Sequence, residues 1–362
     1  MKQNWEYKKL GEVCDIYQPK TISSDKLIEN GRYKVYGANG TIGFYNEYNH
    51  IEKEILLTCR GATCGTINVS EPYSWINGNA MVIHRKDNTI DFSFLKYHML
   101  QIDYSLIITG AAQPQITRQM LSPVSIVIPP LPQQQAIVAE LDKINEVIDL
   151  KKAQLKDLDL LAQSIFYNMF GDPIENPKGW DVKKLGEIGT IITGSTPSTS
   201  DSSNWDGYIN WVTPAELGDQ LYYGETKRKL TEKGAKGLTM MPKGTVLLSS
   251  RAPIGKLAIT TESMCCNQGF KNIICGKDIV NVYVYYYLML TMDSIKELGV
   301  GATFKEVSKK SITTYNIVLP PLPLQQEFAK KIEAIETQKA AIKQSLAEAE
   351  TLLASRMDYW FN

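Results

Sequence analysis

The chain contains two copies of one sequence pattern, and this duplication constrains its fold more than any other feature. Residues 126–170, IVIPPLPQQQAIVAELDKINEVIDLKKAQLKDLDLLAQSIFYNMF, return 191 positions later as residues 317–361, IVLPPLPLQQEFAKKIEAIETQKAAIKQSLAEAETLLASRMDYWF. Earlier segments also correspond: Trp5–Val13 with Trp180–Ile188, and Leu56–Ala62 with Leu247–Pro253. The sequence therefore predicts a globular segment, a long helix, a second globular segment and a second long helix.

Each helix is expected to begin at a proline corner, Pro129–Pro132 or Pro320–Pro323, because proline suits a helix entrance but not a helix interior. Apolar residues then recur at alternate spacings of four and three, which is typical of a coiled-coil seam. A helix of about 38 residues would extend for about 57 Å. The predicted helix-pairing residues are Ile137, Leu141, Ile144, Ile148, Leu155, Leu158 and Ile165, with Phe328, Ile332, Ile335, Ile342, Leu346, Leu353 and Trp360 in the second helix.

Antiparallel pairing of the two helices is predicted, in a register that places Ala162 opposite Ile335 and Ile148 opposite Ala349. The alternative is that each helix packs only on its own globular segment. The predicted fold is α+β: two similar mixed α/β domains separated by two long helices in an antiparallel coiled coil, with a pseudo-two-fold relationship. The predicted domains are residues 1–130 and 173–321, and the predicted spacer helices are residues 131–172 and 322–362.

Short β-rich runs and two shorter helices are expected inside the globular segments. The expected strands are Ile51–Thr58, Ala80–Arg85, Gly244–Ser250 and Lys271–Cys275, and the expected helices are Phe92–Ile102 and Val282–Asp293.

Composition limits the kinds of partner. The net charge is zero, but Lys and Arg slightly outnumber Asp and Glu in the globular segments and are outnumbered in the helices, so any DNA-facing charge would be local. The six cysteines have no CxxC pair and no zinc-type spacing with the three histidines. No apolar run reaches membrane-span length and the N-terminus lacks a signal-peptide pattern. We expect a cytoplasmic protein without a metal site.

Motifs of common enzymes are missing. Ser250–Leu257 resembles a phosphate loop but lacks its first glycine and the Ser or Thr after lysine. Gly299–Ala302 is a short glycine turn rather than a dinucleotide-binding motif. No clustered carboxylates of a metal-dependent nuclease and no GxSxG motif of a hydrolase are found. The sequence therefore predicts a non-catalytic binding protein that binds no cofactor itself.

Recognition is expected in polar loops that both globular segments contain. An arginine follows an apolar strand in each, and its guanidinium suits a guanine edge or a phosphate, although pairing with a carboxylate of the chain is an equal alternative. Amide-rich turns suit adenine, but asparagine also favours turns for local reasons. The candidate DNA-binding residues are Asn39, Arg60, Thr63, Asn77, Asn79, Gln113, Gln115, Arg118, Thr213, Lys227, Arg228, Lys229, Arg251, Lys256, Asn267, Gln268, Lys271, Thr303, Lys305 and Lys309.

The two globular segments differ most in their front parts. The second has 16 additional residues, which lie between Thr196 and Gly244 and include the basic run Lys227–Lys229. Different loops on similar frames indicate two different ligand sequences.

The order and duplication of these motifs resemble the specificity (S) subunits of type I restriction-modification systems. The residues that carry the resemblance are Trp5–Glu12 and Trp180–Glu187, Thr193–Ser198, Trp211–Pro214, Arg251–Gly255, Asn267–Phe270, and the Pro-Pro-Leu-Pro-x-Gln-Gln corner before each helix. The family often has an acidic residue before Gln-Gln, where this chain has Gln133 and Leu324.

The resemblance implies that each globular segment is a target-recognition domain that reads one half of a bipartite, asymmetric site in double-stranded DNA. The helices would set the half-site spacing and dock two methyltransferase (M) subunits that carry S-adenosylmethionine, and restriction (R) subunits would add ATP- and Mg²⁺-dependent cleavage. The alternatives are a coiled-coil scaffold without DNA binding and a self-contained restriction or modification enzyme. The bases recognised, the spacer length and the presence of a restriction subunit are not encoded in any motif.

Overall fold

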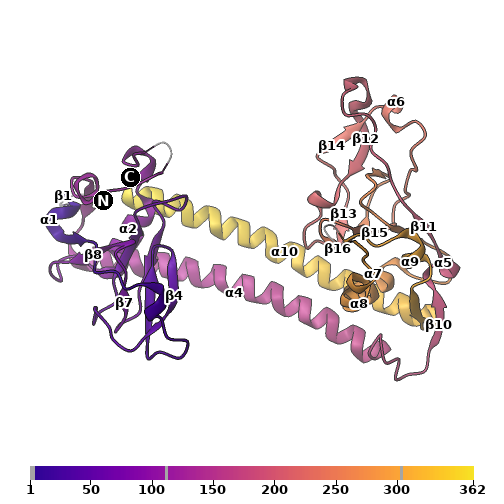
Figure 1. Cartoon of the computed structure of the whole chain (residues 1–362), viewed down its shortest axis with the longest axis horizontal. Helices are drawn as coiled ribbons and strands as arrows, with labels where there is room; N and C mark the ends of the chain where they lie inside the picture. Colours follow the sequence, from indigo (N-terminus) through magenta and orange to yellow (C-terminus); the bar gives the residue numbers. More distant parts are fainter. Residues whose placement is uncertain (1–4, 111–112, 302–304) are drawn as a thin grey trace. The chain divides into compact units, whose positions relative to one another are not determined.

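The computed structural model describes residues 5–110, 113–301 and 305–362. The chain divides into two compact units (Figure 1). Unit 1 contains residues 1–151 and 345–362, and unit 2 contains residues 152–344. Each unit therefore holds one globular segment together with a part of both long helices. The predicted domain boundaries stay a prediction.

The described residues of unit 1 form three sheets, with strand orders β1-β9, β2-β8-β5-β6 and β4-β3-β7. Its elements are β1 (Glu6–Lys9), α1 (Leu10–Val13), β2 (Cys14–Tyr17), η1 (Ser24–Lys26), β3 (Tyr33–Gly37), β4 (Gly40–Tyr45), β5 (Ile55–Thr58), β6 (Ile67–Val69), β7 (Trp75–Ile76), β8 (Ala80–Arg85), α2 (Phe92–Gln101), η2 (Tyr104–Leu106), α3 (Arg118–Leu121), β9 (Ser125–Ile128) and the start of α4 (Leu131–Phe170).

Unit 2 repeats this plan with the sheets β10-β19, β11-β18-β15-β16-β13 and β14-β12-β17. Its elements are β10 (Asp181–Lys184), α5 (Leu185–Ile188), β11 (Gly189–Ile192), η3 (Ser202–Asn204), β12 (Trp205–Val212), η4 (Pro214–Glu216), β13 (Tyr222–Tyr223), β14 (Arg228–Leu230), α6 (Glu232–Ala235), β15 (Val246–Ser250), β16 (Ile254–Thr260), β17 (Cys265–Cys266), β18 (Asn272–Cys275), α7 (Asn281–Leu290), α8 (Met292–Glu297), α9 (Lys309–Thr313), β19 (Asn316–Leu319) and α10 (Leu322–Phe361).

The duplicated motifs have matching structural roles. After the proline corner, Gln134 is fully buried, and its Nε2 donates to the Pro129 carbonyl at 2.8 Å. Gln325 is equally buried and donates to the Pro320 carbonyl at the same distance. The first glutamine also accepts from the backbone N–H of Asp91, and the second from that of Val280. The glutamine therefore fixes the start of each long helix against the strand-to-helix connection before it.

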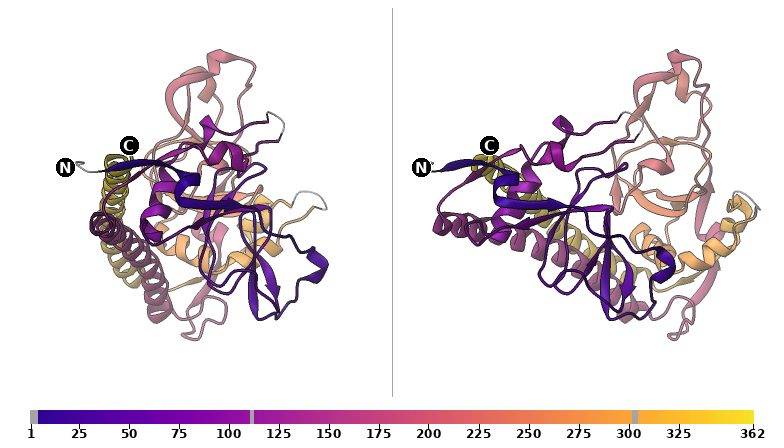
Figure 2. Two further views of the ribbon diagram at one scale, coloured as in Figure 1. Left: turned by 90° about the vertical axis from the view of Figure 1, so that its left-hand side faces the viewer. Right: turned by 60° about the vertical axis from the view of Figure 1, so that its left-hand side comes forward.

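The long helices pack against each other in opposite directions within each unit (Figure 1, Figure 2). In unit 1, the Arg356 guanidinium on α10 pairs with Glu140 on α4. In unit 2, Lys339 on α10 pairs with Asp159 on α4 at 2.8 Å. The predicted register places Arg356 and Lys339 one residue away from these partners, so the antiparallel prediction is confirmed.

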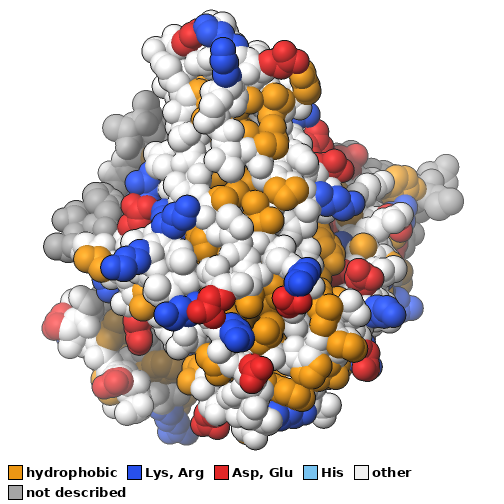
Figure 3. All heavy atoms as spheres, turned by 90° about the vertical axis from the view of Figure 1, so that its right-hand side faces the viewer, with side chains coloured by type: hydrophobic (Ala, Val, Ile, Leu, Met, Phe, Trp, Pro, Cys, Tyr) orange, Lys and Arg blue, Asp and Glu red, His pale blue; other side chains and the backbone are white. Residues whose placement is uncertain are grey.

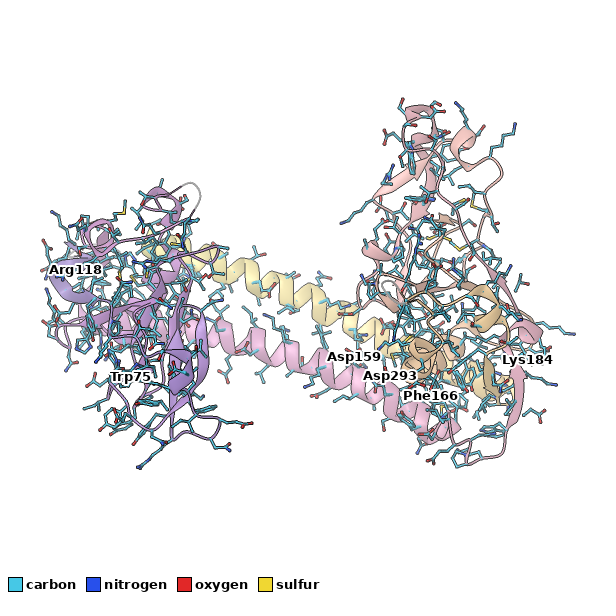
Figure 4. All side chains as sticks on the ribbon, viewed as in Figure 1. Trp75, Arg118, Asp159, Phe166, Lys184 and Asp293 are labelled. Carbon is cyan, nitrogen blue, oxygen red and sulfur yellow. The ribbon has the colours of Figure 1, made fainter. Side chains whose placement is uncertain are left out.

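All fourteen predicted helix-pairing residues are buried or half-buried. The buried ones are Ile137, Leu141, Ile148, Phe328, Ile332 and Ile335, and the half-buried ones are Ile144, Leu155, Leu158, Ile165, Ile342, Leu346, Leu353 and Trp360. In unit 2, Phe166 adds an aromatic cluster to the seam, because its ring stacks on Tyr283 at 5.6 Å and meets Phe328 edge-on at 5.6 Å. Figure 4 labels Phe166 on α4.

Most expected short elements are present with shifted ends. β8 has its predicted bounds, while β5 begins at Ile55 rather than Ile51, and β15 and β18 begin one or two residues later than expected. The predicted helix Val282–Asp293 is wrong as one element, because α7 ends at Leu290 and α8 begins at Met292. Between them, the Thr291 hydroxyl donates to the Tyr287 carbonyl at 2.9 Å, a local bond of the kind that competes with regular helix geometry.

Candidate nucleic-acid interface

A surface hollow of about 980 Å³ in unit 2 brings together four of the predicted DNA-binding residues. These residues come from separate segments of the chain: Thr213, Arg251, Asn267 and Lys305. Lys296 also lines the hollow. Its other lining residues are small or apolar: Pro214, Ala215, Ala252, Pro253, Ile254 and Gly269. The predicted residue Thr303 lies outside the described residues. Three cationic side chains, an amide and a hydroxyl around an apolar floor suit a phosphate and a base edge.

The turn that carries Arg251 is fixed from both sides. The backbone N–H of Ser250 donates to the Gly269 carbonyl at 2.8 Å, and the Ser249 hydroxyl donates to the Pro253 carbonyl at 2.8 Å. Ala252 has a φ of 49°, which turns the chain sharply after the arginine. The Arg251 side chain is 39% exposed, and its guanidinium lies 3.7 Å from the Glu306 carboxylate. Arg251 therefore has a defined position at the edge of the hollow.

Glu306 also holds a buried lysine. Lys271 is only 6% exposed, and its Nζ donates to the Glu306 carboxylate and to the Ser250 hydroxyl, each at 3.0 Å. A buried ammonium needs such partners, because burial without them costs several kcal/mol. Lys271, a predicted DNA-binding residue, is thus paired with Glu306 and Ser250 inside unit 2, and its contact with DNA stays a prediction.

Glu216 holds the segment that contributes Thr213, Pro214 and Ala215 to the lining of the hollow. This carboxylate accepts from the Thr213 backbone N–H at 2.9 Å, from the Tyr223 hydroxyl at 3.0 Å and from the Lys227 backbone N–H at 2.8 Å. Burial and the adjacent Glu216 carboxylate raise the pKa of Tyr223, so its hydroxyl stays protonated and remains a donor. Sequence reasoning missed Glu216 and Glu306, although both are acids within otherwise polar recognition segments.

An arm of unit 2, defined here as residues 205–235, lies within the segment that differs most from unit 1 and contains β12, η4, β13, β14 and α6. Trp205 and Trp211 pack edge to face at 5.1 Å, and the Arg228 guanidinium lies 3.5 Å from the centre of the Trp205 ring. Among the described residues, no carboxylate pairs with Arg228. A guanidinium stacked on an indole keeps its N–H edge available for a phosphate. The neighbouring Lys227 is exposed, while Lys229 lies 3.8 Å from the exposed Glu225.

The remaining predicted residues of unit 2 are in different environments. Lys256 is half-buried and its Nζ donates to the Leu217 carbonyl at 2.7 Å. Gln268 is exposed and accepts from the Thr196 hydroxyl at 2.7 Å. Lys309 is exposed at the start of α9. The Lys256 ammonium is therefore engaged by the backbone, whereas Gln268 and Lys309 are accessible.

In unit 1, the loop after β5 and the loop before α3 are joined by backbone hydrogen bonds. Arg60 forms a β-bridge with Gln115, and the Gly61 N–H donates to the Pro114 carbonyl at 3.0 Å. Arg60, Thr63, Gln113 and Gln115 are all exposed. Within the described part of the chain, no carboxylate pairs with Arg60. The structure therefore places two separately predicted segments, the Arg60 loop and the Gln113–Gln115 segment, side by side.

The other predicted residues of unit 1 do not all belong to this group. Asn77 is 3% exposed; its Oδ1 accepts from the Ile22 backbone N–H and the Trp75 indole N–H, and its Nδ2 donates to the Ile22 carbonyl, so the side chain is bonded inside unit 1. Asn39 and Asn79 are exposed. Arg118 lines a separate hollow of about 400 Å³. Figure 4 labels Arg118 and Trp75 at separate positions in unit 1.

The surface charge is mixed rather than uniformly basic. On the face drawn in Figure 3, Lys and Arg side chains alternate with Asp and Glu, and hydrophobic side chains lie between them. This agrees with the zero net charge. Within the described residues, no helix is long and apolar enough to cross a membrane, and no group of three His, Cys, Asp or Glu side chains could hold a metal ion.

Comparisons with solved structures find the same fold. The crystal structure of a type I restriction-modification S subunit from M. genitalium matches with a TM-score of 0.62 and 14% identity, covering 99% of this chain and 96% of that one. A chain from a study of complex assembly and conformational transition of the type I R-M system matches with a TM-score of 0.61 and 20% identity, covering 98% and 97%.

Comparisons with curated sequences point to one family. The type I restriction enzyme MjaIX specificity subunit of Methanocaldococcus jannaschii is 42% identical over 159 residues, which is 42% of this chain and 37% of that protein. A protein of the same organism, provisionally named as the MjaX specificity subunit, is 28% identical over 350 residues, covering 91% and 76%. The model of the type I restriction modification DNA specificity domain matches residues 2–159 and 177–351. Because these matches include most of the sequence, this chain belongs to the family of type I restriction-modification specificity subunits.

Proposed function

We propose that this chain reads a bipartite, asymmetric site in double-stranded DNA, with one half-site for each unit. The observation that carries the proposal is the arginine at the end of a matching central strand in each unit, Arg60 after β5 and Arg251 after β15. The backbone around the two arginines is alike, but the polar side chains beside them differ. Such an arrangement suits two related readers of two different base sequences.

Within unit 2, base reading is assigned to the hollow and phosphate contact to the arm. Arg251 and Asn267 line the hollow with donors and acceptors that match purine edges. Arg228 and Lys227 on the arm are exposed cations, and cations of this kind supply the sequence-independent part of DNA affinity.

The long helices are proposed to dock two methyltransferase subunits and to set the half-site spacing. Several large apolar side chains on α4 are exposed: Val147 and Leu150 in unit 1, and Leu160 and Leu161 in unit 2. Apolar side chains exposed on a helix are typical of surfaces that a partner protein covers. The catalytic chemistry belongs to the partners in this proposal: S-adenosylmethionine to the methyltransferase subunits, and ATP and Mg²⁺ to restriction subunits.

The test is footprinting of the chain co-expressed with its methyltransferase subunit on a library of duplexes. The proposal predicts protection of two short, separated sequences whose recovery depends on both. Salt-dependent binding without sequence preference, or protection of one continuous site, would refute it.

A further inference from the structure

The same backbone frame surrounds the arginine in both units. In unit 1, the Ile116 N–H donates to the Cys59 carbonyl at 3.0 Å, and Thr109 and Gln115 form a β-bridge. In unit 2, the Val307 N–H donates to the Ser250 carbonyl at 3.0 Å, and Val300 and Glu306 form the equivalent bridge. Glu306 therefore occupies the place that Gln115 has in unit 1.

A second residue beside the arginine also differs between the two units. Thr58 pairs with Ala80 in unit 1, and Ser249 pairs with Phe270 in unit 2. The following residue is Met81 in unit 1 and Lys271 in unit 2, and both side chains are buried. Unit 1 thus has the neutral pair Met81 and Gln115 where unit 2 has the ion pair of Lys271 and Glu306.

The ion pair constrains Arg251. Lys271 engages one carboxylate oxygen of Glu306 at 3.0 Å, which fixes the carboxylate, and the other oxygen lies 3.7 Å from the Arg251 guanidinium. The fixed Glu306 carboxylate repels a phosphate that approaches Arg251. Its attraction for the guanidinium also restricts the Arg251 side chain to few rotamers. Arg60 has no such carboxylate among the described residues, so nothing comparable opposes a phosphate contact there.

We propose that Glu306 is a specificity-determining positioning residue: it directs Arg251 to the edge of a guanine in the half-site of unit 2. Arginine matches the guanine O6 and N7 acceptors bidentately, and holding the fork in place favours that geometry over a phosphate contact. Arg60, without a fixed carboxylate, contacts a backbone phosphate in the other half-site. This inference rests on the proposed function.

The test exchanges the ion pair for the neutral pair of unit 1. The double variant Lys271→Met with Glu306→Gln avoids leaving a buried lysine without its carboxylate. The full chain is purified with its methyltransferase subunit, and binding is measured by competition with duplexes that carry 7-deazaguanine or another base at each guanine. Replacing residues 196–246 with the matching segment of a relative identifies the half-site of unit 2.

The wild-type complex is expected to lose roughly tenfold or more in affinity when that one guanine is changed. In the double variant the loss falls below about threefold, and the slope of log affinity against log salt steepens by about 0.9 because Arg251 gains a phosphate. The matched variant Gln115→Glu in unit 1 should make the slope shallower by a similar amount and leave the half-site of unit 2 unchanged.

The inference would be overturned if the folded double variant lost as much affinity as the wild type when that guanine is changed. It would also be overturned if no guanine in the half-site of unit 2 affected binding. If the double variant does not assemble, Arg251→Gln decides instead, because this side chain is partly exposed. That variant should lose the preference for the same guanine, and retention of every base preference would overturn the inference. Absence of bipartite binding by the wild-type complex would instead refute the proposed function itself.

Discussion

Acid should destabilise unit 1 through His98, a residue of α2 that is 5% exposed. Its Nε2 accepts from the Val127 backbone N–H at 2.9 Å, so the ring is neutral with its proton on Nδ1. Protonation would place a second donor against that N–H, next to the Phe361 ring at 5.1 Å. Burial lowers the pKa of His98 from 6.5 to about 4.

The magnitude follows from proton linkage. Below pH 6.5, the unfolded chain binds a proton at this ring that the folded chain does not bind until about pH 4. The free energy of unfolding of unit 1 is therefore highest above pH 6.5, and it falls as the pH drops from 6.5 towards 4. Between pH 7.5 and pH 5, this histidine alone should remove about 2 kcal/mol from the free energy of unfolding of unit 1.

The assay compares the wild type with His98→Gln, whose side-chain oxygen can still accept from the Val127 N–H but does not titrate. Urea unfolding at the two pH values is followed by hydrogen exchange in the α2 segment, so that unit 1 is measured separately. The variant should lose about 2 kcal/mol less than the wild type on acidification. Burial also lowers the pKa of His50 to about 4, but His50 is present in both proteins, so its contribution cancels in the difference between them. An equal loss in both proteins would refute the reasoning.

Three further predictions concern the helix seam and the arm. Phe166→Ala should destabilise unit 2 by about 3–5 kcal/mol in urea unfolding, because the ring is fully buried; a loss no larger than that of the exposed neighbour variant Tyr167→Ala would contradict the packing. Arg228→Gln should weaken binding to all duplexes alike and reduce the salt slope by about 1, whereas altered base preference would count against a phosphate role. Inserting one heptad into each long helix should change the half-site spacing in a selection experiment without changing the bases, and an unchanged spacing would exclude the helices as the spacer.

The helices were predictable because their signals are periodic and local. The proline corner, the four-and-three spacing and the duplication together indicated two long helices, and the antiparallel register followed from matching small with large side chains. The break at Thr291 was not predictable, because no proline or glycine marks it in the sequence. Strand ends shifted for a similar reason, since tertiary pairing sets them rather than local propensity.

The recognition loops were predictable as segments, but the hydrogen bonds and ion pairs inside them were not. Arg60 and Arg251 stood out because both follow an apolar strand. Lys271 resembled a DNA-binding lysine until the structure placed Glu306, which is 35 positions away, against it. Asn77 is likewise of a residue type that can bind adenine, yet its side chain is hydrogen-bonded to Ile22 and Trp75. A partner that is distant in sequence leaves no pattern in a single chain.

The most direct test of the two-reader account is adenine-methylation mapping across the genome of cells that express this chain with its methyltransferase subunit. The map is compared with that of a chain in which a related segment replaces residues 196–246. The account predicts a bipartite methylated sequence in which only one half changes on replacement, with the other half and the spacing retained. A change in both halves, or methylation without a bipartite sequence, would contradict it.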